Sequence, residues 1–140
     1  MLPQDLAKSG TEHGEQSALF LWAHLNKTKY PVLEWMHAIP NGGSRGDTAK
    51  SRMIRGAQMK AEGVKQGVAD VFLPFPIAGW HGLYIEMKKP SQRPVKATSK
   101  GGLSDDQVLF KGHCILFNYG WIVCYSWEDA ARTIVQYLEQ

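Results

Sequence analysis

Three ionisable side chains, Asp70, Glu86 and Lys88, lie in a stretch of the chain that otherwise favours β-structure, residues 67–90. Asp70 stands among apolar residues, and residues 83–88 alternate apolar and polar side chains. Because successive side chains of a strand point to opposite faces, Glu86 and Lys88 share one face of the second strand. A half-buried charge must be paired or bound to a metal ion. The spacing therefore predicts a site at which the acid–lysine pair meets Asp70 on the neighbouring strand.

These residue types at this spacing suit metal-dependent hydrolysis of phosphodiester bonds. Two carboxylates supply hard oxygen ligands for Mg²⁺ or Mn²⁺, and such an ion lowers the pKa of a bound water. A neighbouring lysine, here Lys88, orients that water or stabilises the charge that develops on the phosphate. The alternative for Glu86 and Lys88 alone is a surface salt bridge or simple solvation, and the upstream Asp70 favours the catalytic interpretation.

Two segments, GVADVFLP and GLYIEMKKP, resemble the core of the PD-(D/E)xK nuclease superfamily, and specifically of its VRR-NUC (virus-type replication-repair nuclease) family. Three further segments resemble segments of the same family and follow one another in the family's order: TEHGEQSALFLWA, IPNGG and LSDDQ. The resemblance runs from about Thr11 to the C-terminus. Ala69 stands where the superfamily has a proline before the first acid. That proline shapes the backbone and supplies no ligand, so the expected chemistry is unchanged.

The first helix offers two acids for a metal site, Glu12 and Glu15. Residues 15, 19 and 22 share one stripe of the expected helix, and Glu12 lies beside Gln16 at i, i+4 spacing. The resemblance implies that one glutamate of this helix helps to bind the metal. The family's E-x-x-x-Q pattern favours Glu12, with Glu15 as the second choice. The alternative is that both acids only interact with the positive end of the helix dipole.

Two further side chains take an expected role from the resemblance. Ser104 and Gln107 have the spacing of a capping box at the start of a helix. Gln107 is therefore either a cap partner or an active-site residue, and the resemblance favours a place near the metal. The turn at residues 40–43 is rich in residues that tolerate positive φ. Such a sequence is by itself usually only a turn, but in the family it borders the active site, and Asn41 is its candidate side chain.

Basic residues are concentrated at residues 45–65 and 88–100, although the net charge of the chain is only +3. The first segment holds six basic residues against Asp47 and Glu62, and the second holds five and no acid. Two basic segments that flank an acidic pair favour binding to a phosphate backbone. Ordinary solvated faces are the alternative for either segment alone. The candidate DNA-binding residues, together with Asn41, are Arg45, Lys50, Arg52, Arg55, Lys60, Lys65, Lys89, Arg93, Lys96 and Lys100.

Periodicity and capping signals predict an α/β domain. After a flexible tail at residues 1–10, a single domain is expected over residues 11–140. Its elements are expected to be a helix at 11–26, a strand at 31–39, a helix at 47–62, strands around Asp70 and at 83–88, a helix at 104–118, a central buried strand at 121–125 and a helix at 127–139. This order, α-β-α-β-β-α-β-α, predicts a mixed β-sheet flanked by helices. The resemblance implies that the fold is restriction-endonuclease-like.

Composition and the N-terminus argue against several classes of protein. The apolar content of 44% and the charged content of 21% are those of a globular domain, and no apolar run is long enough to span a membrane. The first residues lack the basic and then apolar layout of a signal peptide. Cys114 and Cys124 lie in apolar surroundings, which indicates free thiols in a reducing compartment rather than a disulfide or a zinc site. The expected location is the cytoplasm of a bacterial or phage-infected cell, with no membrane partner.

These interpretations converge on a structure-specific DNA endonuclease that depends on Mg²⁺ or Mn²⁺. Asp70, Glu86 and the backbone carbonyl of Met87 are expected to bind the ion, and Lys88 to position the attacking water. The resemblance implies more, because stand-alone VRR-NUC proteins of phages and bacteria look like homodimers that cut branched DNA such as four-way (Holliday) junctions. Two sites at a fixed spacing would cut two symmetric strands together. The alternatives are a flap or single-strand endonuclease with the same site, and a non-catalytic DNA-binding module of the same fold.

Overall fold

The computed structural model describes residues 1–40, 48–96 and 100–140 of the chain. Neighbouring strands in its sheet pair antiparallel, except that the last strand runs parallel to the third. The predicted mixed sheet is therefore confirmed. Within the described residues the strands lie in sequence order: β1 (His37–Ala38), β2 (Val71–Leu73), β3 (Leu83–Met87) and β4 (Gly120–Cys124).

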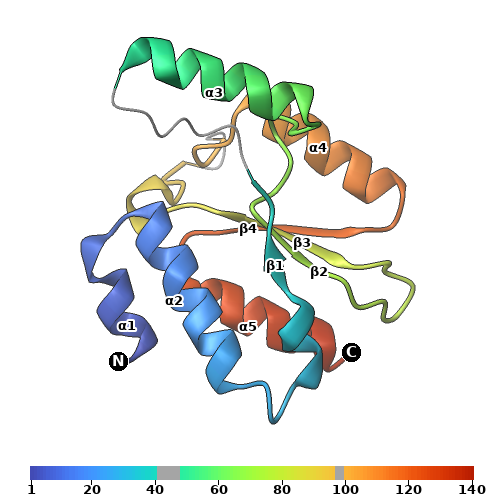
Figure 1. The fold of residues 1–140 in the computed structure, drawn as a ribbon. Coiled ribbons are helices and arrows are strands. Elements are labelled where there is room, and N and C mark those ends of the chain that lie inside the picture. Colours follow the sequence, from blue (N-terminus) through green and yellow to red (C-terminus); the bar gives the residue numbers. More distant parts are fainter. Residues whose placement is uncertain (41–47, 97–99) are drawn as a thin grey trace.

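Helices cover both faces of this sheet (Figure 1). On one side lie α2 (Glu12–Leu25) and α5 (Trp127–Leu138), and on the other lies α4 (Asp105–Leu116). Each of these helices follows a residue whose side-chain hydroxyl accepts a hydrogen bond from a first-turn backbone N–H, which satisfies one donor that the helix itself leaves unpaired. These capping residues are Thr11, Ser104 and Ser126.

The side chains of β3 alternate between the two layers as the sequence predicts. Leu83, Ile85 and Met87 are buried in the core that α2 and α5 close, where burial of such a side chain stabilises the fold by about 1.5–3 kcal/mol. Tyr84 and Glu86 point to the opposite face. The Tyr84 ring meets a ring of α4 edge-on with centroids 5.0 Å apart. The core on one face thus fixes which residues β3 presents on the other.

The segment predicted as a flexible tail contains a short helix. Within residues 1–10, α1 (Pro3–Leu6) is followed by a turn of 3-10 helix at Ala7–Ser9, and Pro3 is buried. The Asp5 carboxylate accepts a hydrogen bond from the Leu2 backbone N–H at 2.8 Å and so caps α1. A Cβ at Gly14 would collide with the Ser9 side chain and would lie 2.8 Å from the Leu6 carbonyl oxygen. Glycine at this position of α2 therefore lets the first residues pack directly against it.

The strand predicted at residues 31–39 is mostly a 3-10 helix, Pro31–Trp35, followed by the short strand β1. Pro31 starts this helix, where its missing N–H costs nothing and its fixed φ fits. Leu33 and Met36, three residues apart, are both buried, whereas Glu34 and Trp35 are exposed. A spacing of three residues matches one turn of a 3-10 helix. Burying both side chains therefore stabilises a 3-10 helix here, although the sequence favours a strand.

The apolar strand predicted to be central is the edge strand β4, because among the strands that the structure describes it pairs with β3 alone. Its residues 120–123 are only partly buried. Both α4 and α5 pack against it, so both of its faces need apolar side chains even though one edge is open. The preceding helix α4, expected to end at residue 118, ends at Leu116, because Asn118 adopts φ +61 and the Tyr119 N–H bonds to the Cys114 carbonyl at 2.9 Å.

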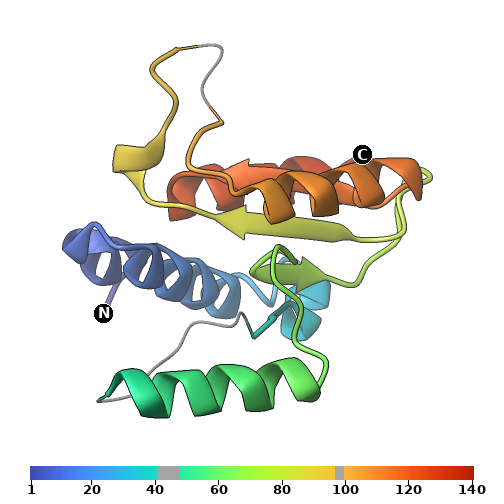
Figure 2. The same ribbon diagram turned by 90° about the horizontal axis from the view of Figure 1, so that it is seen from above.

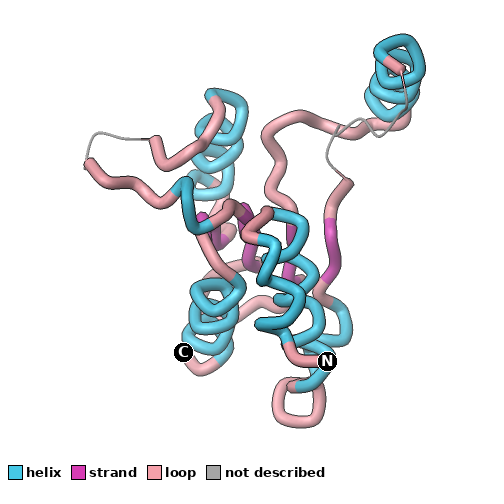
Figure 3. The backbone as a smooth tube through the Cα atoms, turned by 90° about the vertical axis from the view of Figure 1, so that its left-hand side faces the viewer, coloured by secondary structure: helices cyan, strands magenta, loops and turns pink. Residues whose placement is uncertain are grey.

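The remaining long helix, α3 (Ala49–Ala61), stands apart from the sheet and its covering helices in two perpendicular views (Figures 2 and 3). Thr48 caps its first turn, Gly63 follows its end at φ +96, and none of its residues is buried. Gly56 and Met59 are partly buried and the other residues of α3 are exposed, so this helix contributes little to the core. No helix in the described parts of the chain is long and apolar enough to cross a membrane.

Candidate active site

The pairing of β2 with β3 brings the predicted acids together. Val71 lies opposite Ile85 in this antiparallel pair, so one further step in register places Asp70 opposite Glu86. The Met87 backbone N–H donates a hydrogen bond to Asp70 Oδ2 at 2.8 Å, which holds this carboxylate at the end of the strand. Lys88 Nζ lies 3.8 Å from Glu86 Oε1. Asp70, which is distant in the sequence, thus lies beside Glu86 and Lys88, which are two residues apart on one strand.

The Glu86–Lys88 pair is not a surface salt bridge. The two residues are only 2% and 7% exposed, respectively. Burial raises the pKa of Glu86, and the nearby negative charge of Asp70 raises it further. Burial likewise raises the pKa of Asp70. The protein thus keeps two carboxylates and one ammonium where water solvates them poorly, an arrangement typical of functional sites.

One oxygen of this group receives no N–H or hydroxyl donor. Among the described residues, Glu86 Oε2 is buried without such a donor, and the Asp70 carboxyl group lies within hydrogen-bonding reach of the Glu86 side chain. Such a buried acceptor is costly unless something else binds it, and a divalent cation is the ligand that suits a carboxylate oxygen next to a second carboxylate. The residues present therefore fit a bound Mg²⁺ or Mn²⁺. In the described parts of the chain, no three His, Cys, Asp or Glu side chains are grouped closely enough to hold a metal ion by themselves.

The two glutamates of α2 separate clearly. Glu12, at the start of the helix, lines the same cleft as Asp70, Glu86 and Lys88. Glu15 is buried elsewhere, and its Oε1 accepts a hydrogen bond from the Trp127 backbone N–H at 2.8 Å, at the start of α5. The structure thus brings Glu12 to the cleft and gives Glu15 a structural contact, so the second choice made from the sequence does not hold. The two side chains lie one turn apart on the same face of α2, so what separates them is what each end of that turn meets: the cleft for Glu12 and the start of α5 for Glu15.

Gln107 performs both roles that the sequence left open. Its Oε1 accepts a hydrogen bond from the Ser104 N–H at 2.8 Å, which completes the capping box of α4. Its Nε2 donates to Glu86 Oε1 at 2.6 Å. The same amide therefore caps a helix and orients the carboxylate of the site, and the start of α4 is tied to β3.

The cleft around these groups has a volume of about 370 Å³ and contains residues that the sequence analysis did not select. These are Gln66, Gly67, Val68, Ser104 and Asp106. Gly67 has φ +89, and a Cβ there would collide with the backbone carbonyl of Asp106. Gly67, three residues before Asp70, is the feature of the sequence that could have indicated this cleft, because a glycine often stands where two backbones approach closely.

We expect Gly67→Ala to destabilise the protein more than Gly63→Ala, by about 1–3 kcal/mol. Both glycines have similar positive φ values, +89 and +96, so both substitutions strain the backbone alike. Only at Gly67 does the added methyl group meet another backbone, since a Cβ at Gly63 has no neighbour within 4 Å. Thermal unfolding of the two variants measures the difference. Equal losses of stability would show that the contact with α4 is not tight.

The candidate DNA-binding residues fall on two elements. Lys50, Arg52, Arg55 and Lys60 lie exposed on α3, followed by Lys65, and the residues after β3 are Lys89, Arg93, Lys96 and Lys100. Arg93 pairs with Asp129 and Lys100 with Asp105, each at 2.6 Å. Surface ion pairs contribute only about 0–1 kcal/mol, so a phosphate group can replace either carboxylate. Asn41 and Arg45 lie outside the described residues.

Comparison with known proteins gives a likeness at the level of the fold. No family model matches the sequence, and no curated protein matches it. Among solved structures, a protein described as "VRR_NUC domain protein" superposes with a TM-score of 0.67, over 92% of this chain and 88% of that chain, at 22% sequence identity. A likeness at this identity shows the fold. The restriction-endonuclease-like architecture and the resemblance predicted from the motifs are confirmed at that level.

Proposed function

We propose that this protein is a metal-dependent DNA endonuclease whose active centre is Asp70, Glu86 and Lys88. The single observation that carries the proposal is the buried Glu86 Oε2, which receives no N–H or hydroxyl donor among the described residues and lies beside a second carboxyl group and a buried lysine. Asp70 and Glu86, with the Met87 carbonyl and Glu12 at the rim, would hold Mg²⁺ or Mn²⁺. The bound ion supplies an activated water and neutralises charge on the phosphate.

The side chains of the protein position the attacking water and the metal-binding carboxylate. Lys88 Nζ, held near Glu86 Oε1, directs an N–H toward the attacking water and offsets negative charge on the phosphate as the bond breaks. Gln107 keeps the Glu86 carboxylate in one orientation through its Nε2. Two basic elements on either side of the cleft favour a nucleic acid over a small phosphoester. The fold shared with a VRR_NUC domain protein supports the same substrate class.

The test is cleavage of labelled DNA of several shapes, with Mg²⁺, with Mn²⁺ and with EDTA. A four-way junction, a flap, a splayed duplex, a linear duplex and a single strand are compared side by side. We expect cleavage with either ion and none with EDTA, and we expect the four-way junction to be cut fastest. Equal background signals in all three conditions would favour a non-catalytic DNA-binding module. Fastest cutting of the flap would favour the flap endonuclease.

We also propose that two copies associate through the outer face of α4. This face exposes large apolar side chains at i, i+1, i+7 and i+8 spacing, with Leu109 72% and Leu116 73% exposed. Exposed apolar patches of this kind mark protein–protein contacts. An antiparallel pairing of two α4 helices centred on Gly112 places Leu109 of one copy near Ile115 of the other. This pattern is complementary to itself, as a two-fold interface requires.

Leu109→Glu is expected to convert a dimer into a monomer, because it puts a charge against the apolar Ile115 side chain of the other copy. Light scattering coupled to gel filtration measures the mass. Leu25→Glu is the matched control, since Leu25 is also an exposed leucine of a helix, at 57%, but lies on α2. A monomeric mass for the unchanged protein, or the same mass for both variants, would rule out this interface.

A further inference from the structure

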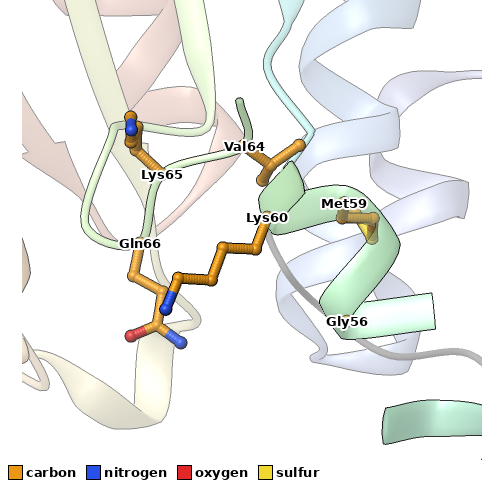
Figure 4. A pocket seen from close by; sticks show the side chains of 6 residues that line it. All are labelled: Gly56, Met59, Lys60, Val64, Lys65 and Gln66. Carbon is orange, nitrogen blue, oxygen red and sulfur yellow. The ribbon is translucent and has the colours of Figure 1, made fainter. Parts of the chain in front are cut away.

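A second cleft lies between the end of α3 and the segment that leads back to the sheet (Figure 4). Its volume is about 360 Å³. Gln66 lines both this cleft and the candidate active site, so the two are neighbours on the molecule. The residues that line the second cleft are Gly56, Met59, Lys60, Val64, Lys65 and Gln66.

The backbone fixes the apolar side of this cleft. The Gly63 N–H bonds to the Lys60 carbonyl at 3.1 Å, and the Val64 N–H bonds to the Met59 carbonyl at 3.0 Å. These two bonds are the pattern with which a glycine in a left-handed conformation ends a helix, and a contact between the two apolar residues usually accompanies it. Met59 and Val64 thus form a wall whose position follows from local hydrogen bonding.

The other side of the cleft is cationic and open. Lys60 and Lys65 are exposed, and Figure 4 shows the Lys60 side chain running toward Gln66 across the space between helix and loop. Among the described residues that line the cleft, none is acidic. A Cβ at Gly56 would have no neighbour within 4 Å, so the helix leaves room at this point.

We infer that this cleft binds one unpaired nucleotide next to the scissile phosphate, an inference that rests on the proposed function. The base lies against Met59 and Val64, and its phosphate lies beside the Lys60 ammonium group, since Figure 4 shows the Lys65 side chain leaving the loop on the side away from Lys60. A phosphate alone would not need an apolar wall. A base inside a duplex is stacked and shows only its edges in the grooves, so only an unstacked base reaches such a wall. The cleft therefore selects DNA that is unpaired beside the cut, as at a branch point.

The experiment measures binding without cleavage, by fluorescence anisotropy in EDTA. The probes are a labelled splayed duplex and a fully paired duplex of equal length. Gly56→Leu fills the cleft and favours helix formation, so poor folding does not explain a loss. Ala57→Leu, the next residue of the same helix and outside the cleft, is the control. We expect the unchanged protein and Ala57→Leu to prefer the splayed duplex about tenfold. Gly56→Leu loses this preference and keeps its affinity for the paired duplex.

A second series removes single bases from the splayed duplex, one position at a time around the branch. One abasic position is expected to weaken binding of the unchanged protein about tenfold and to leave Gly56→Leu unaffected. No preference for the splayed duplex, an equal loss for both DNAs in Gly56→Leu, or no sensitive abasic position would overturn the inference. A different result would contradict the proposed function. In that case the unchanged protein would show the expected binding pattern but would cut neither DNA with Mg²⁺ or Mn²⁺.

Discussion

Glu86→Gln is expected to reduce DNA cleavage about 10³-fold with either metal ion, the largest effect of any single substitution in this protein. The substitution keeps the size of the side chain, and because its single amide oxygen must accept the hydrogen bond from Gln107, its NH₂ group takes the place of Oε2. An NH₂ group beside Asp70 does not bind a divalent cation, whereas a carboxylate oxygen does. The affinity for DNA in EDTA should stay equal or rise, because a negative charge leaves the cleft.

Glu15→Gln is the matched control for this loss of activity. Both residues are buried glutamates, but the Glu15 carboxylate accepts a hydrogen bond from the start of α5 rather than facing the cleft. Its variant should therefore cleave DNA at close to the normal rate. Single-turnover rates with labelled DNA compare the variants under one condition. If Glu86→Gln still cleaved at more than about a tenth of the normal rate, Glu86 would not be a metal ligand.

The central part of the site could be predicted because it depends on local geometry. Glu86 and Lys88 share a face through the two-residue period of one strand, and Asp70 needs only a neighbouring strand. The choice between Glu12 and Glu15 could not be made from the sequence, because both lie in the first turn of α2. It depends on where α5 starts, since the free N–H of Trp127 takes one of the two carboxylates.

The elements that the sequence misplaced share one physical cause, which is burial decided by distant segments. Residues 31–35 form a 3-10 helix because Leu33 and Met36 must both reach the core. The apolar β4 looks central, yet its apolar character comes from the helices that cover its two faces. Tertiary contacts decide such cases over local propensity. For Gln107, local and distant contacts agree. Its amide oxygen completes the capping box, and its amide nitrogen donates to Glu86.

The second large effect concerns stability without metal. Because burial and Asp70 raise the pKa of Glu86 in the folded state, the folded protein binds more protons than the unfolded chain above the ordinary pKa of a glutamate. Stability in EDTA should therefore fall as the pH rises from about 5 to about 8. Glu86→Gln removes the part of this pH dependence of stability that comes from the Glu86 carboxyl group. We expect the variant to be more stable than the unchanged protein by about 1–3 kcal/mol at pH 8 and about equally stable near pH 4.

Denaturant unfolding at both pH values, with EDTA and with Mg²⁺, measures this difference. Metal that binds only the folded state adds about 2.7 kcal/mol at a hundred times its Kd, and it should stabilise the unchanged protein but not the variant. The order of the two proteins at pH 8 is therefore expected to reverse when Mg²⁺ is added. A variant that is less stable in EDTA at pH 8 would mean that the attraction of Lys88 outweighs burial and the Asp70 charge. The carboxylate would then be a structural partner of Lys88 rather than a group held ready for a metal ion.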